Sequence, residues 1–377
     1  MKKIFMIFIC IFVIFPIDSY ADQFAALQYE ELEFDKLMDL SSDYLMEDIS
    51  IENIKDKLLN GENFIDIHTL GGKILSLISE EVMININLVV SLIVLAIVCS
   101  ILTNLQSAFE NRGVSEISFI ACYIVFVALT VTGFYECAKL AGNVINEQAA
   151  FMKMAVPTYI SLMISTGNVT VAKTMEPVFL FAVQFIGGFI DGFMLPVVFW
   201  ISILSVVNNL SDRFHVSKLI DFSKQTITWV LAGMVTFFVA VMNLTGITSY
   251  AVDGVAIRSM KYAVGRFVPV VGGILTDSID TVITSTIVVK NAMGVLGVIV
   301  MILICASPII KLAVSMIMFK LTAGVIEPIA DKRIVGIVSN IASGISLLFI
   351  MVFSVTVMFI ISITTVIGFS NITAMIK

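Results

Sequence analysis

Long apolar runs separated by short polar stretches fill most of the chain after residue 86. Runs long enough to cross a bilayer, which takes about 20 residues, occupy 87–105, 117–135, 229–248 and 334–361. Two further candidates lie at 281–307 and 309–326. The pattern predicts an all-α polytopic integral membrane protein whose transmembrane domain covers residues 86–377, with six or seven transmembrane helices.

Other apolar stretches predict partial or re-entrant segments. Residues 155–166 are too short to span unaided, and 177–207 are interrupted by Gly187-Gly188, Asp191-Gly192 and Pro196. Residues 267–275 are apolar, but this stretch is short and contains Pro269. It is expected to form a re-entrant turn beside a polar segment, 253–266, at the membrane interface.

The first 21 residues have the layout of an export signal. Lys2-Lys3 precede the apolar stretch 4–15, Pro16 breaks it, and small residues precede a cleavage point after Ala21. This apolar stretch is short for a spanning helix. Residues 1–21 are therefore predicted to be a cleavable signal peptide, with an uncleaved anchor as the alternative.

Residues 22–85 are predicted to form an acidic helical arm outside the cytoplasm. They hold 15 Asp/Glu and 4 Lys/Arg, a net charge of −11 within a chain of −7. Apolar residues recur at helical spacing: Phe34, Leu37, Met38, Leu45 and Ile49. Such an arm either docks a partner or is a solvated leader with none.

Composition supports the membrane class and narrows the chemistry. Hydrophobic residues make up 59% of the chain and charged residues 14%, against roughly 25% charged in soluble domains. No basic patch with interleaved aromatic residues indicates nucleic-acid binding. The basic 208–227 loop prefers the cytoplasm, which requires an odd number of crossings between Tyr135 and Asn208.

Neither a metal centre nor an enzyme is expected. The five cysteines form no CxxC pair, and His68 and His215 have no neighbours at ligand spacing. The chain contains no GxxxxGK[ST], GxSxG, HExxH or GxGxxG motif. The sequence therefore predicts no catalytic residues and no cofactor, and any ATP hydrolysis would belong to another protein.

Asp191 is the first of five candidate polar residues at membrane depth. It lies in GGFIDGF, where Gly188 and Gly192 share a helix face and permit close approach of a neighbouring helix. Two interpretations are open. One is a helix-packing seam with Asp191 at a helix break, and the other is a direct role in a transport path.

The remaining candidates are Asp277, Asp280, Lys290 and Asn291. Asp277 and Asp280 stand where a helix is expected to begin, so they are interpreted as caps of its free N–H groups, with acid/base chemistry as the alternative. Lys290 lies about 15 Å further along that helix, too deep for easy snorkelling. It needs an acidic partner, backbone carbonyls or a water-filled cavity, so we expect it to face a polar interior or lumen.

Three stretches resemble the stage III sporulation protein AE family. They read DGVAIRSMKYAVGRFVPVVGGILTDSIDTV from residue 253, VVKNAMGVLGVIV from 288, and VPTYISLMISTGNVTVAKTMEPV at 156–178. The resemblance covers nearly the whole chain and is weakest in residues 22–85. It supplies no catalytic residues.

The resemblance implies a role in endospore formation. Such proteins are membrane subunits of a secretion-like channel complex in the mother-cell membrane around the forespore (the outer forespore membrane). Their partners are other stage III sporulation membrane proteins, including a separate ATPase, and a forespore-side protein across the intermembrane space. Two alternatives remain open: a self-contained secondary transporter with a polar site at membrane depth, and a scaffold that has no pore.

Overall fold

A computed structural model describes residues 67–108, 112–210, 216–267 and 272–375. The predicted signal peptide and residues 22–66 of the acidic arm lie outside the described residues. Within the described ranges the chain is helical, with short turns and no strand. The elements are α5 (Ile67–Ala108), α6 (Arg112–Ser165), α7 (Val169–Phe189), the π-helical turn η1 (Ile190–Met194), α8 (Leu195–Leu210), α9 (Ser217–Phe267), α10 (Gly272–Ile326) and α11 (Lys332–Met375).

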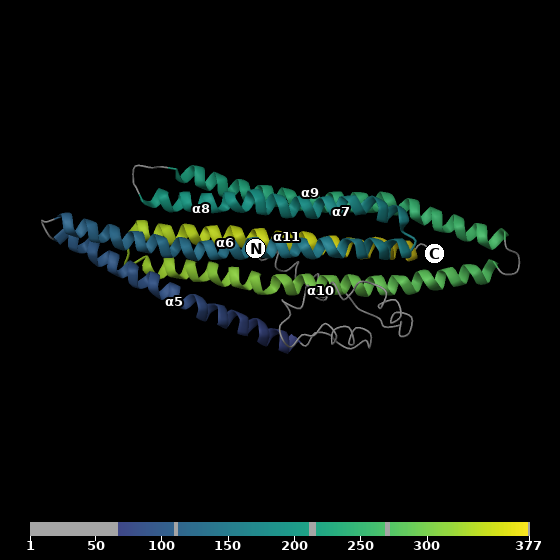
Figure 1. The fold of residues 1–377 in the computed structure, drawn as a ribbon, viewed down its shortest axis with the longest axis horizontal. Helices are drawn as coiled ribbons and strands as arrows, with labels where there is room; N and C mark the ends of the chain where they lie inside the picture. Colours follow the sequence, from purple (N-terminus) through teal and green to yellow (C-terminus); the bar gives the residue numbers. More distant parts are fainter. Residues whose placement is uncertain (1–66, 109–111, 211–215, 268–271, 376–377) are drawn as a thin grey trace.

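These elements make six antiparallel passes in one elongated bundle (Figure 1). The passes are α5, α6, the α7–η1–α8 unit, α9, α10 and α11, and each contains a segment long and apolar enough to cross a membrane. The predicted all-α polytopic class is therefore confirmed. The described residues provide six such passes, the lower of the two numbers predicted.

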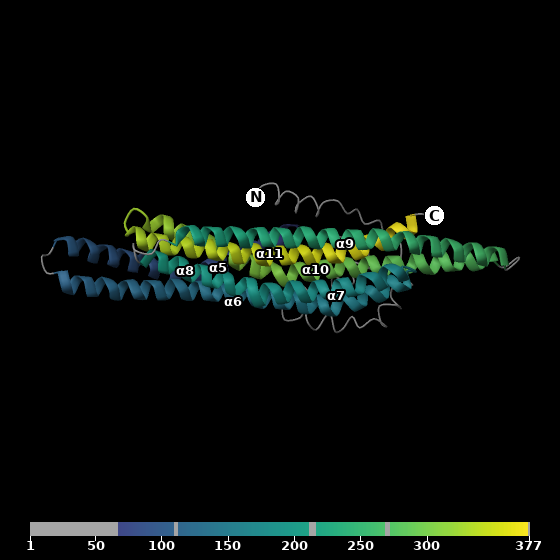
Figure 2. The same cartoon turned by 90° about the horizontal axis from the view of Figure 1, so that it is seen from above.

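Helix α11 forms the centre of the bundle (Figure 2). It packs against α6, α8, α9 and α10. Its buried positions recur every third or fourth residue, as a helix surrounded by others requires. They include Ile337, Ile341, Ile345, Leu348 and Val352, all 0% exposed.

The helices are much longer than a bilayer is thick, and this corrects several sequence expectations. α10 contains both predicted spans, 281–307 and 309–326, in one helix with Pro308 in its interior. At 55 residues it is about 80 Å long, against roughly 30 Å of hydrocarbon. The two spans were separated wrongly because a proline removes one helical hydrogen bond, which a packed membrane helix tolerates.

The predicted break in residues 154–207 is also wrong. The short apolar stretch at 155–166 is the end of α6, which reaches Ser165 with Pro157 inside it. The chain then turns at Gly167, whose φ of 85° favours glycine. It returns as α7, η1 and α8 with only a one-turn π-bulge at Asp191. This return is one crossing, the odd number required if the basic 208–227 stretch is cytoplasmic. That stretch was predicted to be a loop, but residues 217–227 form the start of α9.

The ends of α9 and α10 project beyond the other helices (Figure 1). Asp253 lies beside the start of α7, and α9 continues to Phe267, about 21 Å further along the helix. Residues 253–266 therefore extend α9 instead of forming a separate interfacial segment. In the stretch 267–275, predicted to form a re-entrant turn, Phe267 ends α9 and residues 272–275 begin α10, whereas 268–271 lie outside the described residues.

Candidate functional site

Lys290 is buried inside the bundle. Only 1% of its surface is exposed. Its Nζ donates a hydrogen bond of 2.9 Å to the backbone carbonyl of Ile367 on α11. Of the three environments expected for a lysine at this depth, the structure provides the backbone carbonyl.

Two glycines on α10 make this contact possible by allowing close helix packing. A Cβ at Gly294 would collide with the side chain of Ile367, and a Cβ at Gly297 would collide with the hydroxyl of Tyr159 on α6. The absence of both side chains lets α10 approach α11 and α6 closely. Lys290, one turn away, can then reach the backbone of α11.

Asn291 stands next to Lys290 but is used differently. Its side chain is partly buried, and its Oδ1 is buried with no hydrogen-bond donor among the described residues. Leaving a buried acceptor without a donor is costly. In this pair the Lys290 amine is therefore bound to a backbone carbonyl, whereas the Asn291 side-chain oxygen has no hydrogen-bond donor among the described residues.

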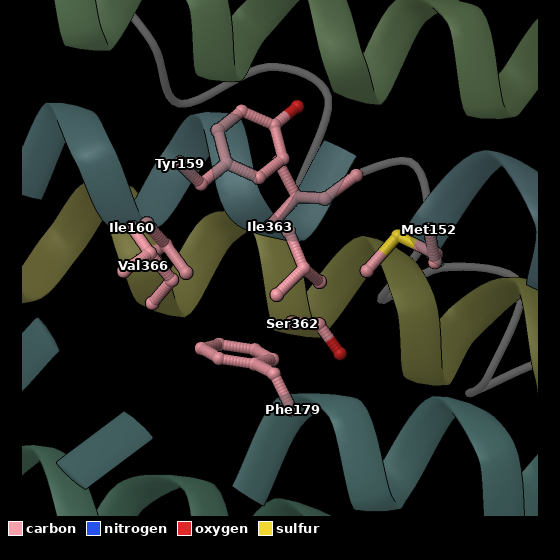
Figure 3. A pocket seen from close by; sticks show the side chains of 8 residues that line it. Met152, Tyr159, Ile160, Phe179, Ser362, Ile363 and Val366 are labelled. Carbon is pink, nitrogen blue, oxygen red and sulfur yellow. The ribbon is translucent and has the colours of Figure 1, made fainter. Parts of the chain in front are cut away.

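A narrow apolar pocket lies one turn from this contact (Figure 3). Residues of α6, α7 and α11 line it: Met152, Val156, Tyr159, Ile160, Phe179, Ser362, Ile363 and Val366. The space between them is too small for a water molecule. The hydroxyl of Ser362 donates to Met358 O within its own helix, so the pocket offers no polar route toward Lys290.

Asp253 is a structural anchor that the sequence analysis did not identify. It is 3% exposed, and its two carboxylate oxygens accept the backbone N–H groups of Thr170 at 2.9 Å and Val171 at 2.8 Å. Asn168 at the N-cap of α7 makes no side-chain cap, so α9 supplies the cap instead. The sequence offered a partial signal: a DG pair inside a long helix and a TGN turn before another.

Replacing Asp253 with asparagine is expected to loosen the start of α7. One acceptor and the negative charge opposite the helix N-terminus are lost, at a cost of about 0.5–2 kcal/mol. Hydrogen exchange at the Thr170 and Val171 amides should accelerate, while Asp221→Asn, an exposed site on the same helix, should leave it unchanged. Equal protection in both variants would contradict the capping role.

A second buried polar contact joins α6 to α11. Gln148 is 0% exposed and Thr356 is 3% exposed. Gln148 Nε2 donates to Thr356 Oγ1 at 2.8 Å, and this hydroxyl donates to Val352 O at 2.9 Å. The contact fixes the register of the two parallel helices.

Thr356→Val is expected to destabilise the bundle by about 1 kcal/mol, because the Gln148 amide loses its partner in an apolar interior. Thr356→Val combined with Gln148→Leu should recover the loss, since both polar groups are then removed. Thermal unfolding of the purified full chain measures both effects. A double variant that is less stable than the single one would refute this account.

The structure separates the other candidates from Lys290. Asp191 lies beside Gly142 of α6, six residues before Gln148, whereas Ile367 lies eleven residues beyond Thr356. Because α6 and α11 are parallel, Asp191 and Lys290 are about 25 Å apart along the bundle. Asp191 therefore cannot pair with Lys290. The helix-packing seam expected at Gly188 and Gly192 is not formed within the described chain, because a Cβ at either glycine would meet open space.

The capping role expected for Asp277 and Asp280 is wrong. α10 begins at Gly272, and no acidic residue occurs in its first turn. The two aspartates occupy the sixth and ninth positions of the helix, beyond the N–H groups that a helix start leaves free. Apolar Ile274 and Leu275 before them continue the helix instead of forming a turn.

These features define a polytopic all-α membrane protein with a large hydrophobic core and a few buried polar contacts between its helices. Within the described residues, His, Cys, Asp and Glu form no cluster of three that would hold a metal ion.

The chain belongs to the stage III sporulation protein AE family, whose sequence model matches residues 49–370. It is 30% identical over 362 residues to stage III sporulation protein AE of Bacillus subtilis (strain 168), covering 95% of this chain and 91% of that protein. No solved structure matches the chain. It is thus a multi-pass membrane protein of a sporulation family, and this family is not a known enzyme family.

Proposed function

We propose that this protein is a non-catalytic membrane subunit of a secretion-like channel complex between mother cell and forespore, required for endospore formation. It resides in the mother-cell membrane around the forespore. Its partners are other stage III sporulation membrane proteins, with a separate ATPase and a forespore-side protein among them. Membership of a sporulation membrane-protein family supports this role.

The closed interior of the bundle is the observation that carries the proposal. A self-contained transporter typically places a binding site near mid-membrane, between discontinuous helices. Here the described passes are continuous except for the π-bulge, Lys290 binds a backbone carbonyl, and the neighbouring apolar pocket is too small for a water molecule. A bundle whose described passes form no site of that kind is better suited to act as one wall or support of a larger assembly.

The positions of the loops support an orientation for this subunit. The C-terminal ends of α5, α8 and α10 lie at one end of the bundle (Figure 1), and the basic residues of the 208–227 stretch favour the cytoplasm there. The projecting ends of α9 and α10 lie at the opposite end, which then faces the intermembrane space. We expect this projection, with the acidic arm, to bind partners.

Affinity isolation from sporulating cells tests the proposal. The tagged full chain, solubilised mildly, should bring down other stage III membrane proteins and an ATPase, and the same chain from non-sporulating cells should not. Purified alone in lipid vesicles, it should show no solute uptake. Robust uptake by the isolated chain, or its recovery as a lone protein from sporulating cells, would overturn the proposal.

A further inference from the structure

The outward side of α6 carries polar residues along a stretch where a membrane helix normally faces lipid. We define the α6 polar face as Glu136, Lys139, Asn143, Asn146, Glu147 and Lys153. All are exposed on the bundle surface except Glu147, which is half-buried. We infer that this face lines a water-filled path between copies of this chain in the assembled complex.

The spacing of these residues shows that the face is one continuous surface, and its polar groups have no partners among the described residues. Its members follow one another at helical intervals, so they form one strip along α6. Their side chains make no hydrogen bond or ion pair with the described residues, although both signs of charge are present. Polar side chains that do not neutralise one another require solvent.

Two contacts with α11 show that this strip lies at the same depth as the apolar outward surface of α9. Gln148 of α6 binds Thr356 of α11, and Lys224 of α9 lies 3.5 Å from Asn340 of α11. Thr356 is 16 residues beyond Asn340, and because α9 and α11 are parallel, Ala240 of α9 lies at the same level, about 24 Å along. Gln148 is therefore level with Ala240, and the middle of the α6 polar face, near Asn143 and Asn146, is level with residues 235–238 of α9.

The two sides of the bundle differ in charge at this level. The outward side of α9 exposes apolar Phe237, Ala240 and Leu244, and its exposed Thr236 and Asn243 donate hydrogen bonds to carbonyls of their own helix. α6 lies on the opposite side of α11 (Figure 2) and exposes Asn143 and Asn146 instead. Lysines can snorkel toward an interface, but these amides and the Glu147 carboxylate are too short to do so.

Water fits this face better than a directly packed helix does. Copies in one membrane share the same orientation, so a symmetric contact through α6 would place Glu136 near its twin and Lys139 near its twin. Such like-charge contacts are unfavourable at low dielectric. Copies arranged around a common axis with water between them keep every charge solvated, and Asp191, partly exposed beside Gly142, extends the polar wall.

This inference rests on the proposed function and specifies where the path lies: outside each bundle, along α6, and not beside Lys290. Fixed charges of both signs suit a path for polar solutes that discriminates weakly by charge. A single chain then has no path of its own, and a path forms only where the α6 polar faces of several copies surround water.

Thiol accessibility tests the inference. In a full-length, cysteine-free chain within membranes from sporulating cells, single cysteines are placed at Lys139, Asn143 and Asn146, with the exposed Ala232, Thr236 and Phe237 of α9 as controls at matched depth. A charged, membrane-impermeant thiol reagent needs water and a thiolate. We expect the α6 positions to react roughly tenfold faster or more than the α9 positions.

Equal, slow reaction at both sets would overturn the inference, because α6 would then be covered by lipid or by a partner helix. The result is separable from the proposed function. Unreactive α6 positions in a chain that still co-isolates with its partners refute only the water-filled path, whereas failure to co-isolate refutes the subunit role itself.

Discussion

Gly297→Ala is expected to destabilise the bundle by roughly 1–3 kcal/mol, the usual effect of overpacking. The added methyl group would occupy the position of the Tyr159 hydroxyl, and Tyr159 is only 5% exposed, so its ring has little room to move. α10 and α6 would have to separate. Because α10 also carries Lys290, the contact with Ile367 should weaken as well.

A matched glycine and a compensating change make this prediction specific. Gly233 lies in the interior of α9, where an added Cβ meets nothing within 4 Å, so Gly233→Ala should be neutral or stabilising by up to about 1 kcal/mol. Tyr159→Phe in the Gly297→Ala background removes the colliding oxygen and should restore part of the loss. Thermal unfolding and cellular abundance report both effects, and unchanged stability in Gly297→Ala would contradict the packing account.

The sequence predicted the membrane class and six or seven passes, but not the continuity of the helices. Apolar run length reports where a helix meets lipid, and it does not report where the helix ends. The predicted spans ended at residues 135 and 248, before the polar stretches 136–153 and 253–266, yet these stretches lie within α6 and α9. Main-chain hydrogen bonds continue through such positions, so a helix can extend well beyond the bilayer.

The sequence allowed Lys290 to be predicted as a buried polar residue, but it did not allow its hydrogen-bond partner to be predicted. A lysine deep in an apolar run is visible in sequence, but Ile367 is 77 residues away and contributes only a backbone carbonyl, which every residue has. Asp253 was missed for the same reason, since its partners are N–H groups of α7. Contacts between side chains and distant backbone leave no sequence pattern.

The asymmetry between α6 and α9 was only partly visible for a related reason. Glu136, Lys139, Glu147 and Lys153 are evident in the sequence as a weakly amphipathic stretch. Which side of α6 faces outward depends on how it packs against α7, α10 and α11. Only the assembled bundle shows that these polar residues are turned away from the core.

Lys290→Leu is expected to lower spore formation while leaving the protein intact, because it removes the polar contact through which α10 is joined to α11 at Ile367. Replacing a buried charge with an apolar side chain of similar volume is often neutral or stabilising by about 1–4 kcal/mol. Ile367 lies inside α11, so its carbonyl keeps the N–H of the fourth residue onward. Abundance and melting temperature should therefore match or exceed those of the native chain, and the count of heat-resistant spores should fall.

Lys320→Leu is the matched control, because it removes the same charge from an exposed position on the same helix. It should retain normal spore counts. If Lys290→Leu also sporulates normally, the buried amine is dispensable, and the proposed role of Lys290 fails while the fold remains as described. If spores are lost together with the protein, Lys290 acts through stability, which the melting temperature of the purified variant would show directly. Loss of spores at full abundance is the outcome that assigns Lys290 to function, since the structure gives no stability reason for it.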